Sequence, residues 1–141
     1  SGRILRVAEV AADDAAAAAL RLRRGRMLWL VDRLSLADGR PVCLGRHHFP
    51  QTRLPDLPDA LADGKGSITR ALAACGIAEY ARRSTRVTAR LPSLEEAEVL
   101  GHPRNRPVIV TEAVNIDVQG VPVEYGVATY PAGRVQLVFE F

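Results

Sequence analysis

The chain has 141 residues, 48% of them hydrophobic and 25% charged, which are the proportions of one soluble globular domain spanning 1–141. No apolar run approaches the roughly 18 residues that a membrane span needs, so we expect a cytoplasmic protein without membrane contact. The net charge of +3 is too small and too scattered to indicate nucleic-acid binding by itself. Cys43 and Cys75 lie outside any CxxC spacing, so the sequence predicts no disulfide framework, no zinc site and no cofactor.

The first predicted elements are a short strand at 3–10 and an alanine-rich helix over about 14–24, capped by aspartate and stopped by glycine. A strand at 27–36 and a returning strand at 40–49 follow. They form a predicted hairpin around a three-residue turn at 37–39.

A loop rich in proline and glycine comes next, and Ser67 is the predicted N-cap of a helix at 68–75. We expect one long strand at 77–91. Ser93, with a glutamate three residues later, is the capping-box signature of a short helix that ends at Leu100. The chain closes on a predicted meander of three strands at 107–117, 121–130 and 134–141.

Two stretches of the sequence are near copies of each other. Residues 39–50 read GRPVCLGRHHFP and residues 120–131 read GVPVEYGVATYP, so each contains G-x-P-V-x-x-G and ends on an aromatic residue and a proline. Gly39 and Gly120 are expected to be the left-handed residues of two hairpin turns. We therefore predict an α+β fold with an internal helix-plus-hairpin repeat, in which both hairpins join one antiparallel sheet of about six or seven strands covered by helices on one face.

The register of the hairpins decides which side chains share a face of the sheet. A three-residue turn with a glycine bulge pairs Leu36 with Arg40 and places Arg33 opposite Cys43. One face of the second hairpin then carries Val123, Tyr125, Val127 and Thr129. The predicted polar face carries Arg33, Ser35, Cys43, Gly45 and His47 from the first hairpin and Glu124, Gly126, Ala128 and Tyr130 from the second.

A solvated sheet face would also account for these residues, but two features favour a binding pocket. Gly45 and Gly126 weaken a strand and are expected where another group approaches the backbone closely. Ser67 and Thr69 open a helix behind a glycine-flanked loop, where free N–H groups and hydroxyls, with a nearby arginine, can hold an anion. Ser67 alone would only cap the helix.

Three classes of function are compatible with such a pocket. An enzyme would need a nucleophile or an acid–base pair, and the cysteine, histidine and glutamate side chains form no recognised catalytic motif. A nucleic-acid binder would need aromatic platforms beside its basic residues, and only Tyr80 lies near the arginines of 82–90. A polar pocket with one anion site and no catalytic constellation favours a sensor domain.

The order of elements and several motifs resemble a known family. The motifs are SITRAL at 67–72, SLEEA at 93–97, NRPVIVTEA at 105–113 and DVQGVPVEYG at 117–126. With them, the whole chain resembles the UTRA effector-binding domain of HutC-type regulators in the GntR superfamily. The stretches DRLSLADGRPVCLGRHHFP at 32–50 and RVQLVFE at 134–140 are similar to those of regulators of phosphonate uptake and degradation operons.

The resemblance implies a chorismate-lyase-like α+β fold and a homodimer built through these domains. It also implies an N-terminal winged helix-turn-helix, outside this chain, that reads operator DNA. By analogy with family members that bind sugar phosphates, the effector would be held by Arg33, Ser67, Thr69, Glu124 and Tyr130.

Other positions depart from the family pattern. Ser35 replaces what is often a second arginine, and Gly45 stands where an acidic residue is common. With Arg46 and His47 beside Gly45, the pocket is expected to take a smaller or more anionic ligand, and Arg134 would close it. We therefore expect a domain that senses a small phosphonate or phosphate-like anion and changes dimer geometry and operator affinity, with an enzyme of chorismate-lyase-like fold as the alternative.

Overall fold

The structure is a computed structural model that describes residues 1–141. It contains six strands and four helices, so the predicted α+β class is confirmed. None of the helices has both the length and the apolar character needed to cross a membrane. In chain order the elements are β1 (Gly2–Ala11), α1 (Asp14–Leu20), β2 (Met27–Ala37), β3 (Arg40–Pro50), α2 (Leu57–Asp63), α3 (Ile68–Ala74), β4 (Tyr80–Arg90), α4 (Leu94–Leu100), β5 (Val108–Asp117) and β6 (Pro122–Pro131).

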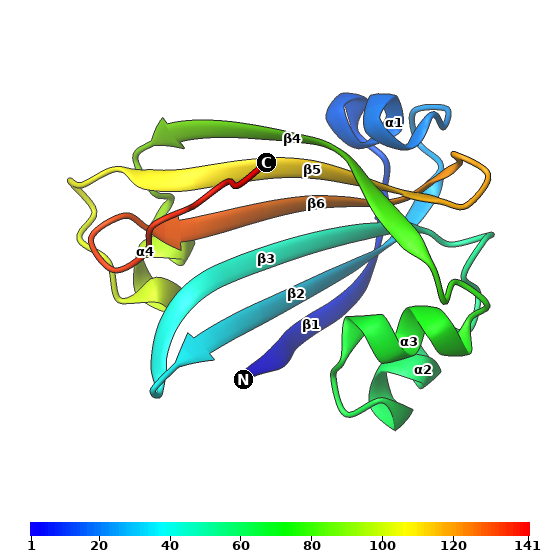
Figure 1. The fold of residues 1–141 in the computed structure, drawn as a ribbon, viewed down its shortest axis with the longest axis horizontal. Helices are drawn as coiled ribbons and strands as arrows, with labels where there is room; N and C mark the ends of the chain where they lie inside the picture. Colours follow the sequence, from blue (N-terminus) through cyan, green and yellow to red (C-terminus); the bar gives the residue numbers. More distant parts are fainter.

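The six strands form one antiparallel sheet in the order β1-β2-β3-β6-β5-β4 (Figure 1). This order is symmetric, because each half of the chain contributes a strand, a helix and a hairpin. The two hairpins meet at the centre of the sheet, where Arg46 of β3 pairs with Val127 of β6. These residues are 81 positions apart (127 − 46 = 81), the same spacing as the sequence repeat. A pseudo-twofold axis therefore passes between β3 and β6, and the repeat is one strand longer than predicted.

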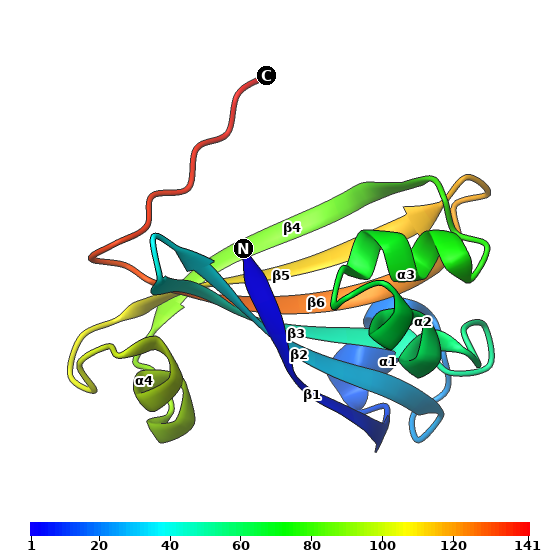
Figure 2. The same ribbon diagram turned by 90° about the horizontal axis from the view of Figure 1, so that it is seen from below.

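Helices cover both faces of the sheet rather than one, as Figure 2 shows. On one face α1 packs its alanines and Leu20 around Leu28, and Leu100 of α4 packs on the same face. The other face is partly covered by α2 and α3, which pack against Val31 and Phe49. The prediction missed α2 because its segment is rich in proline. Pro58 lies in the first turn of α2, where a backbone N–H has no helical partner in any case.

Two predicted boundaries are wrong because helix caps lie elsewhere. α1 ends at Leu20, since Arg21 adopts a left-handed conformation (φ 55°) and the N–H of Leu22 donates to Ala17 O at 2.9 Å. β4 begins at Tyr80 rather than at Ile77. Ile77 instead follows α3 and helps to cap it, because its backbone N–H donates to Leu72 O at 2.8 Å, and its side chain is buried in the core beneath α2 and α3.

The first hairpin turn has two residues, not three. Asp38 and Gly39 both have positive φ angles, 51° and 75°. A bulge beside this turn then shifts the register, so that Arg33 lies opposite Gly45 rather than Cys43. Turn and bulge together shift the pairing by an even number of residues, so the predicted face assignment of this hairpin still agrees with the structure.

The second hairpin follows the prediction with one exception. Gly120 has a φ angle of 81°, as expected for the left-handed residue of its turn. The register shifts where Asn115 pairs with Glu124 and Ile116 with Pro122, which leaves Val123 as an extra residue in β6. Val123 therefore turns away from the face predicted for it and is fully buried in the core beneath α2 and α3.

The predicted strand at 134–141 is wrong. β6 is already paired with β3 on one side and β5 on the other, so the segment that follows it cannot form a hairpin with β6. Residues 135–141, here called the C-terminal arm, form no regular element. In Figure 2 the arm leaves the sheet on the side opposite α1 and α4.

Candidate functional site

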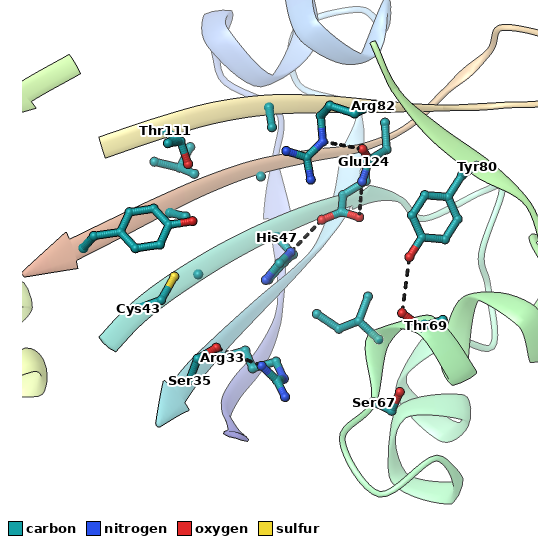
Figure 3. Close-up of a pocket in the computed structure, with 18 residues that line it drawn as sticks. Arg33, Ser35, Cys43, His47, Ser67, Thr69, Tyr80, Arg82, Thr111 and Glu124 are labelled. Atoms are coloured by element: carbon teal, nitrogen blue, oxygen red, sulfur yellow. Dashed lines mark hydrogen bonds and ion pairs between the residues drawn. The ribbon is translucent and has the colours of Figure 1, made fainter. Parts of the chain in front are cut away.

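A polar cavity of about 450 Å³ lies on the face of the sheet that α2 and α3 partly cover (Figure 3). Five strands form its floor, and the start of α3 forms one wall. Its volume is within the range of small-molecule sites, about 300–1,000 Å³. The lining residues are Arg33, Ser35, Cys43, Gly45, His47, Ser67, Ile68, Thr69, Tyr80, Arg82, Thr111, Ala113, Asn115, Glu124, Gly126, Val127, Ala128 and Tyr130.

A chain of hydrogen bonds crosses four neighbouring strands on the floor of the cavity (Figure 3). His47 Nδ1 on β3 lies 2.6 Å from Glu124 Oε2 on β6. Asn115 Nδ2 on β5 donates to Glu124 Oε1 at 3.1 Å, and Arg82 Nε on β4 donates to Asn115 Oδ1 at 2.8 Å. Because Glu124 is buried, these partners fix the position of its carboxylate.

One glycine makes room for this chain. A Cβ atom at Gly45 would lie 2.6 Å from His47 Nε2, a distance too short for any side chain. At Gly126, by contrast, a Cβ atom would lie 3.4 Å from Glu124 Oε2, which is an ordinary van der Waals contact. The group that approaches the backbone at Gly45 is therefore an imidazole of the same strand.

The cavity carries more positive than negative charge. Arg33 Nη1 donates to Ser35 Oγ at 3.0 Å, and its guanidinium lies so close to Gly2 that a Cβ there would clash with it. Arg82 bonds only to an amide and a hydroxyl. Neither arginine has a carboxylate partner, and Glu124 is the only carboxylate in the lining. The arrangement therefore favours an anionic ligand.

The end of the cavity distant from α3 is neutral. Cys43 and Thr111 lie at this end in Figure 3. Burial raises the pKa of the Cys43 thiol to about 11, and the hydrogen bond with Tyr130 and the charge of Arg33 offset this only in part. Burial also raises the pKa of Tyr130. Both groups are therefore protonated at neutral pH, so this end suits an uncharged part of a ligand.

The opposite end is formed by the start of α3. Ser67 is the N-cap, and its Oγ accepts the N–H of Arg70 at 3.2 Å. Thr69 Oγ1 lies 3.3 Å from the hydroxyl of Tyr80, which links α3 to β4. Both side chains line the cavity and present hydroxyl groups to it.

The structure brings eight of the ten predicted site residues together in the cavity. The other two lie elsewhere. Arg46 is on the opposite face, because side chains alternate along β3, and its Nη2 donates to Glu95 Oε2 at 3.0 Å. Arg134 donates to the backbone carbonyls of Pro41 and Leu100, so it anchors the start of the C-terminal arm and does not close the cavity. The predicted residues that line the cavity are Arg33, Ser35, Gly45, His47, Ser67, Thr69, Glu124 and Tyr130.

Sequence reasoning did not assign Tyr80, Arg82, Thr111 or Asn115 to the site. All four lie on β4 and β5, which are joined through α4 rather than by a tight turn. The register of this pair could therefore not be fixed from a turn. The alternation of side chains along β5 could have identified Thr111 and Asn115. These two residues are an even number of positions apart, so they share a face, and Asn115 lies opposite Glu124.

Comparison with known proteins identifies the family. Residues 1–136 match the model of the UTRA domain. The HTH-type transcriptional regulator RB1450 of Rhizobium meliloti (strain 1021) is 35% identical over 133 residues, which are 94% of this chain and 54% of RB1450. The chain thus spans about half the length of this relative. The chain belongs to the UTRA domain family.

Solved structures share the fold. PhnF from Mycobacterium smegmatis superposes with a TM-score of 0.86 at 23% identity, covering 97% of this chain and 60% of PhnF. Its effector domain alone gives 0.83 at 22% identity, covering 97% of this chain and 83% of the domain. A GntR-family regulator from Bacillus cereus superposes with a TM-score of 0.84 at 18% identity, covering 100% of this chain and 97% of the Bacillus cereus chain. RB1450 and the Bacillus cereus protein are named as transcriptional regulators, which agrees with the expected class of a sensor domain rather than an enzyme.

Proposed function

We propose that this chain is the effector-binding domain of a cytoplasmic GntR-family, HutC-type transcriptional regulator, and that its cavity binds a small phosphonate or phosphate-like anion. The observation that carries the proposal is the pair Arg33 and Arg82, which line the cavity without a carboxylate partner. A guanidinium matches the oxygen atoms of a phosphonate in charge and geometry. The resemblance of 32–50 and 134–140 to regulators of phosphonate operons supports a role in phosphonate uptake or metabolism.

Each part of the cavity has a proposed role. Arg33, with the hydroxyls of Ser67 and Thr69, binds the anionic oxygens. Glu124 and Tyr130 orient the rest of the ligand. The substituent on phosphorus lies toward the neutral end, where a protonated thiol and small side chains leave space for an uncharged group.

Regulation requires the ligand to bind one state of the regulator more tightly than another, because equal affinity for both would shift no equilibrium. We propose that two copies form a homodimer through this domain, and that the effector favours one dimer geometry. The N-terminal winged helix-turn-helix domain that the resemblance implies would then release operator DNA, and the name of RB1450, an HTH-type transcriptional regulator, supports such a domain.

Calorimetric titration tests the ligand class. The chain is titrated with phosphate, methylphosphonate and 2-aminoethylphosphonate, each at the same ionic strength. We expect saturable binding of one anion per chain with different affinities for the three. Absence of binding by all three would contradict the phosphonate assignment.

A matched pair of variants locates the binding site. Arg33→Gln removes the guanidinium from the cavity, and Arg40→Gln removes one from the exposed end of the same hairpin. Loss of charge-assisted hydrogen bonds worth about 2 kcal/mol weakens binding roughly thirtyfold. We expect this loss for Arg33→Gln only. Equal affinity of the two variants would place the anion outside the cavity.

A further inference from the structure

A second polar cavity, here called the α1 cavity, lies on the face of the sheet that α1 covers. It has a volume of about 420 Å³ and lies between α1 and the paired strands β4 and β5. The cavity described above, here called the effector cavity, is on the other face, and Figure 2 shows α1 and α3 on opposite sides of the sheet. The two cavities share no lining residue.

A bulge in β4 directs its arginines to both faces of the sheet. The register of β4 against β5 shifts between Arg82 and Ser84, so Arg83 is an extra residue. Without this shift Arg82 and Arg86, an even number of residues apart, would share one face. With it, Arg82 lines the effector cavity, whereas Arg83 and Arg86 line the α1 cavity.

The pseudo-twofold relation between the two halves explains why there is a cavity under α1. Val127 is the counterpart of Arg46, and its strand partner Glu112 is the counterpart of Asp32, the strand partner of Arg46. In the first half Arg46 lies between two carboxylates. Its Nε is 3.5 Å from Asp32 Oδ1, and its Nη2 is 3.0 Å from Glu95 Oε2 of α4. In the second half a valine replaces the arginine.

α1 also lacks the carboxylate that α4 supplies. Glu95 is the second residue after Ser93, the N-cap of α4, and the second residue after Asp13, the N-cap of α1, is Ala15. Alanine and valine side chains are much shorter than those of glutamate and arginine. The space that an ion pair fills under α4 is therefore open under α1, where Ala15 lines the cavity.

The arginine beside Glu112 is left without an ion pair. In the first half Arg6 of β1 lies beside Asp32 and contacts its carboxylate, with Nε 3.3 Å from Oδ2. Arg86 of β4 lies beside Glu112 in the same way but forms no ion pair. Glu112 instead accepts a hydrogen bond from the hydroxyl of Tyr125.

The charges around the α1 cavity favour a ligand with two negative charges. Arg21 and Arg83, like Arg86, form no ion pair within the chain. Glu112 is the only carboxylate in the lining, so three arginines and one carboxylate leave a net charge of +2. A phosphate group carries a charge of about −1.5 to −2 at neutral pH and would neutralise it.

We propose that the α1 cavity is a second anion site, which binds a phosphate group as free phosphate or as a small phosphate monoester. Each guanidinium can donate two parallel hydrogen bonds to phosphate oxygens. The volume is within the range of small-molecule sites, and the short side chains of α1 leave room for a few carbon atoms beside the charged group. The site goes beyond the proposed function, because none of its residues lines the effector cavity.

Alanine methyl groups report on the two cavities separately. Ala15, Ala18 and Ala19 line the α1 cavity, and Ala113 and Ala128 line the effector cavity. The chain, isotopically labelled in its alanine methyl groups, is titrated by NMR with inorganic phosphate and with glycerol phosphate, and sodium chloride holds the ionic strength constant. We expect saturable shifts of the α1 methyl groups. Tighter binding of glycerol phosphate would identify a monoester as the ligand, and equal affinities would identify the phosphate group alone.

Matched arginine variants locate the anion. Arg83→Gln and Arg86→Gln each remove one guanidinium from the α1 cavity, and Arg26→Gln removes an exposed one from the loop before β2, outside both cavities. We expect each of the first two to weaken binding at the α1 methyl groups at least about tenfold, and the third to leave it unchanged. Unchanged signals of Ala113 and Ala128 in the free variants would show that they are folded.

Three results would overturn the proposal. The first is that phosphate and glycerol phosphate leave the α1 methyl groups unshifted. The second is equal affinity in all three variants, which would place the anion outside the α1 cavity. The third is loss of the α1 shifts in Arg33→Gln, since the shifts would then be transmitted from the effector cavity. If the effector-cavity methyl groups alone fail to respond, the proposed function is contradicted and the α1 site stands.

Discussion

The imidazole of His47 occupies the space that a side chain at position 45 would need, so Gly45 and His47 act as one unit. The ring also stacks on Phe49, with centroids 6.3 Å apart and planes 12° from parallel. Its Nδ1 lies 2.6 Å from the Glu124 carboxylate. The glycine that looks from sequence like an opening for a ligand thus fixes a histidine in the floor of the cavity.

Gly45→Ala is expected to weaken anion binding more than it weakens the fold. The new Cβ would lie 2.6 Å from His47 Nε2, and the ring can move aside at the cost of its contact with Glu124. We expect about a tenfold loss of affinity for methylphosphonate, equivalent to about 1.4 kcal/mol, by calorimetry. Gly133→Ala, where no atom lies within 4 Å of the added Cβ, is the control and should change nothing. Unaltered affinity of the Gly45 variant would show that His47 is not part of the site.

Glu124→Gln separates two classes of ligand. The substitution keeps the size of the side chain and removes the only negative charge in the cavity lining. Binding of inorganic phosphate should persist, whereas 2-aminoethylphosphonate, whose amine needs a carboxylate, should bind about tenfold more weakly. Calorimetric titration of both ligands measures the difference. If both affinities fall alike, Glu124 holds His47 and Asn115 in place rather than contacting ligand.

Cys43 is expected to resist alkylation. Raising the pKa of its thiol from 9.0 to about 11 leaves about one hundredth of the usual thiolate at pH 8, and the thiolate is the reactive form. Iodoacetamide should therefore modify Cys43 about 100-fold more slowly in the native chain than in the same chain unfolded in urea. Mass spectrometry of peptides at timed intervals gives the ratio. Equal rates would show that the thiol is exposed and ordinary.

Glu96 is expected to make the fold sensitive to acid. Hydrogen bonds from Arg90 chiefly lower the pKa of this carboxyl from 4.5 to about 2, helped by Ser93 and Thr129. Since the folded pKa lies below the unfolded one, the stabilisation is complete above about pH 4.5 and is lost as the pH falls toward 2.

Glu96→Gln should therefore lower the free energy of unfolding by about 2 kcal/mol at pH 7 and flatten its decline between pH 5 and 3. Urea titrations at several pH values measure both effects. Glu98→Gln, at an exposed position of the same helix α4, is the matched control. A wild-type chain equally stable at pH 3 and pH 7 would contradict the assignment.

The sequence predicted those parts of the fold that depend on local geometry. Alternation along the two hairpins brought Arg33, His47 and Glu124 to one face, although the first turn was assigned one residue too many. That error did not change which side chains share a face. The shorter turn and the bulge beside it together shift the pairing by two residues, and an even shift leaves each side chain on its predicted face. Gly120 and the capping box at Ser93 were likewise read from local chemistry.

What the sequence could not predict depends on tertiary neighbours. Arg82 reaches the cavity only because β4 pairs with β5, and no short turn sets that register. The segment 134–141 has the alternation of a strand, but whether a strand forms depends on a free edge, which β6 does not offer. α2 was missed because proline in a first turn and proline in a loop look the same in a sequence.

The pseudo-twofold axis between β3 and β6 makes the centre of the sheet a seam between two structurally equivalent halves. Residues 1–78 contain β1, α1 and the first hairpin together with α2 and α3, and residues 79–141 contain β4, α4 and the second hairpin. Each fragment would keep its own hairpin and helix, and the seam would be closed by the ladder between β3 and β6. The two fragments are thus natural partners for complementation, and since His47 lies in one and Glu124 in the other, only the reassembled pair would have the complete cavity.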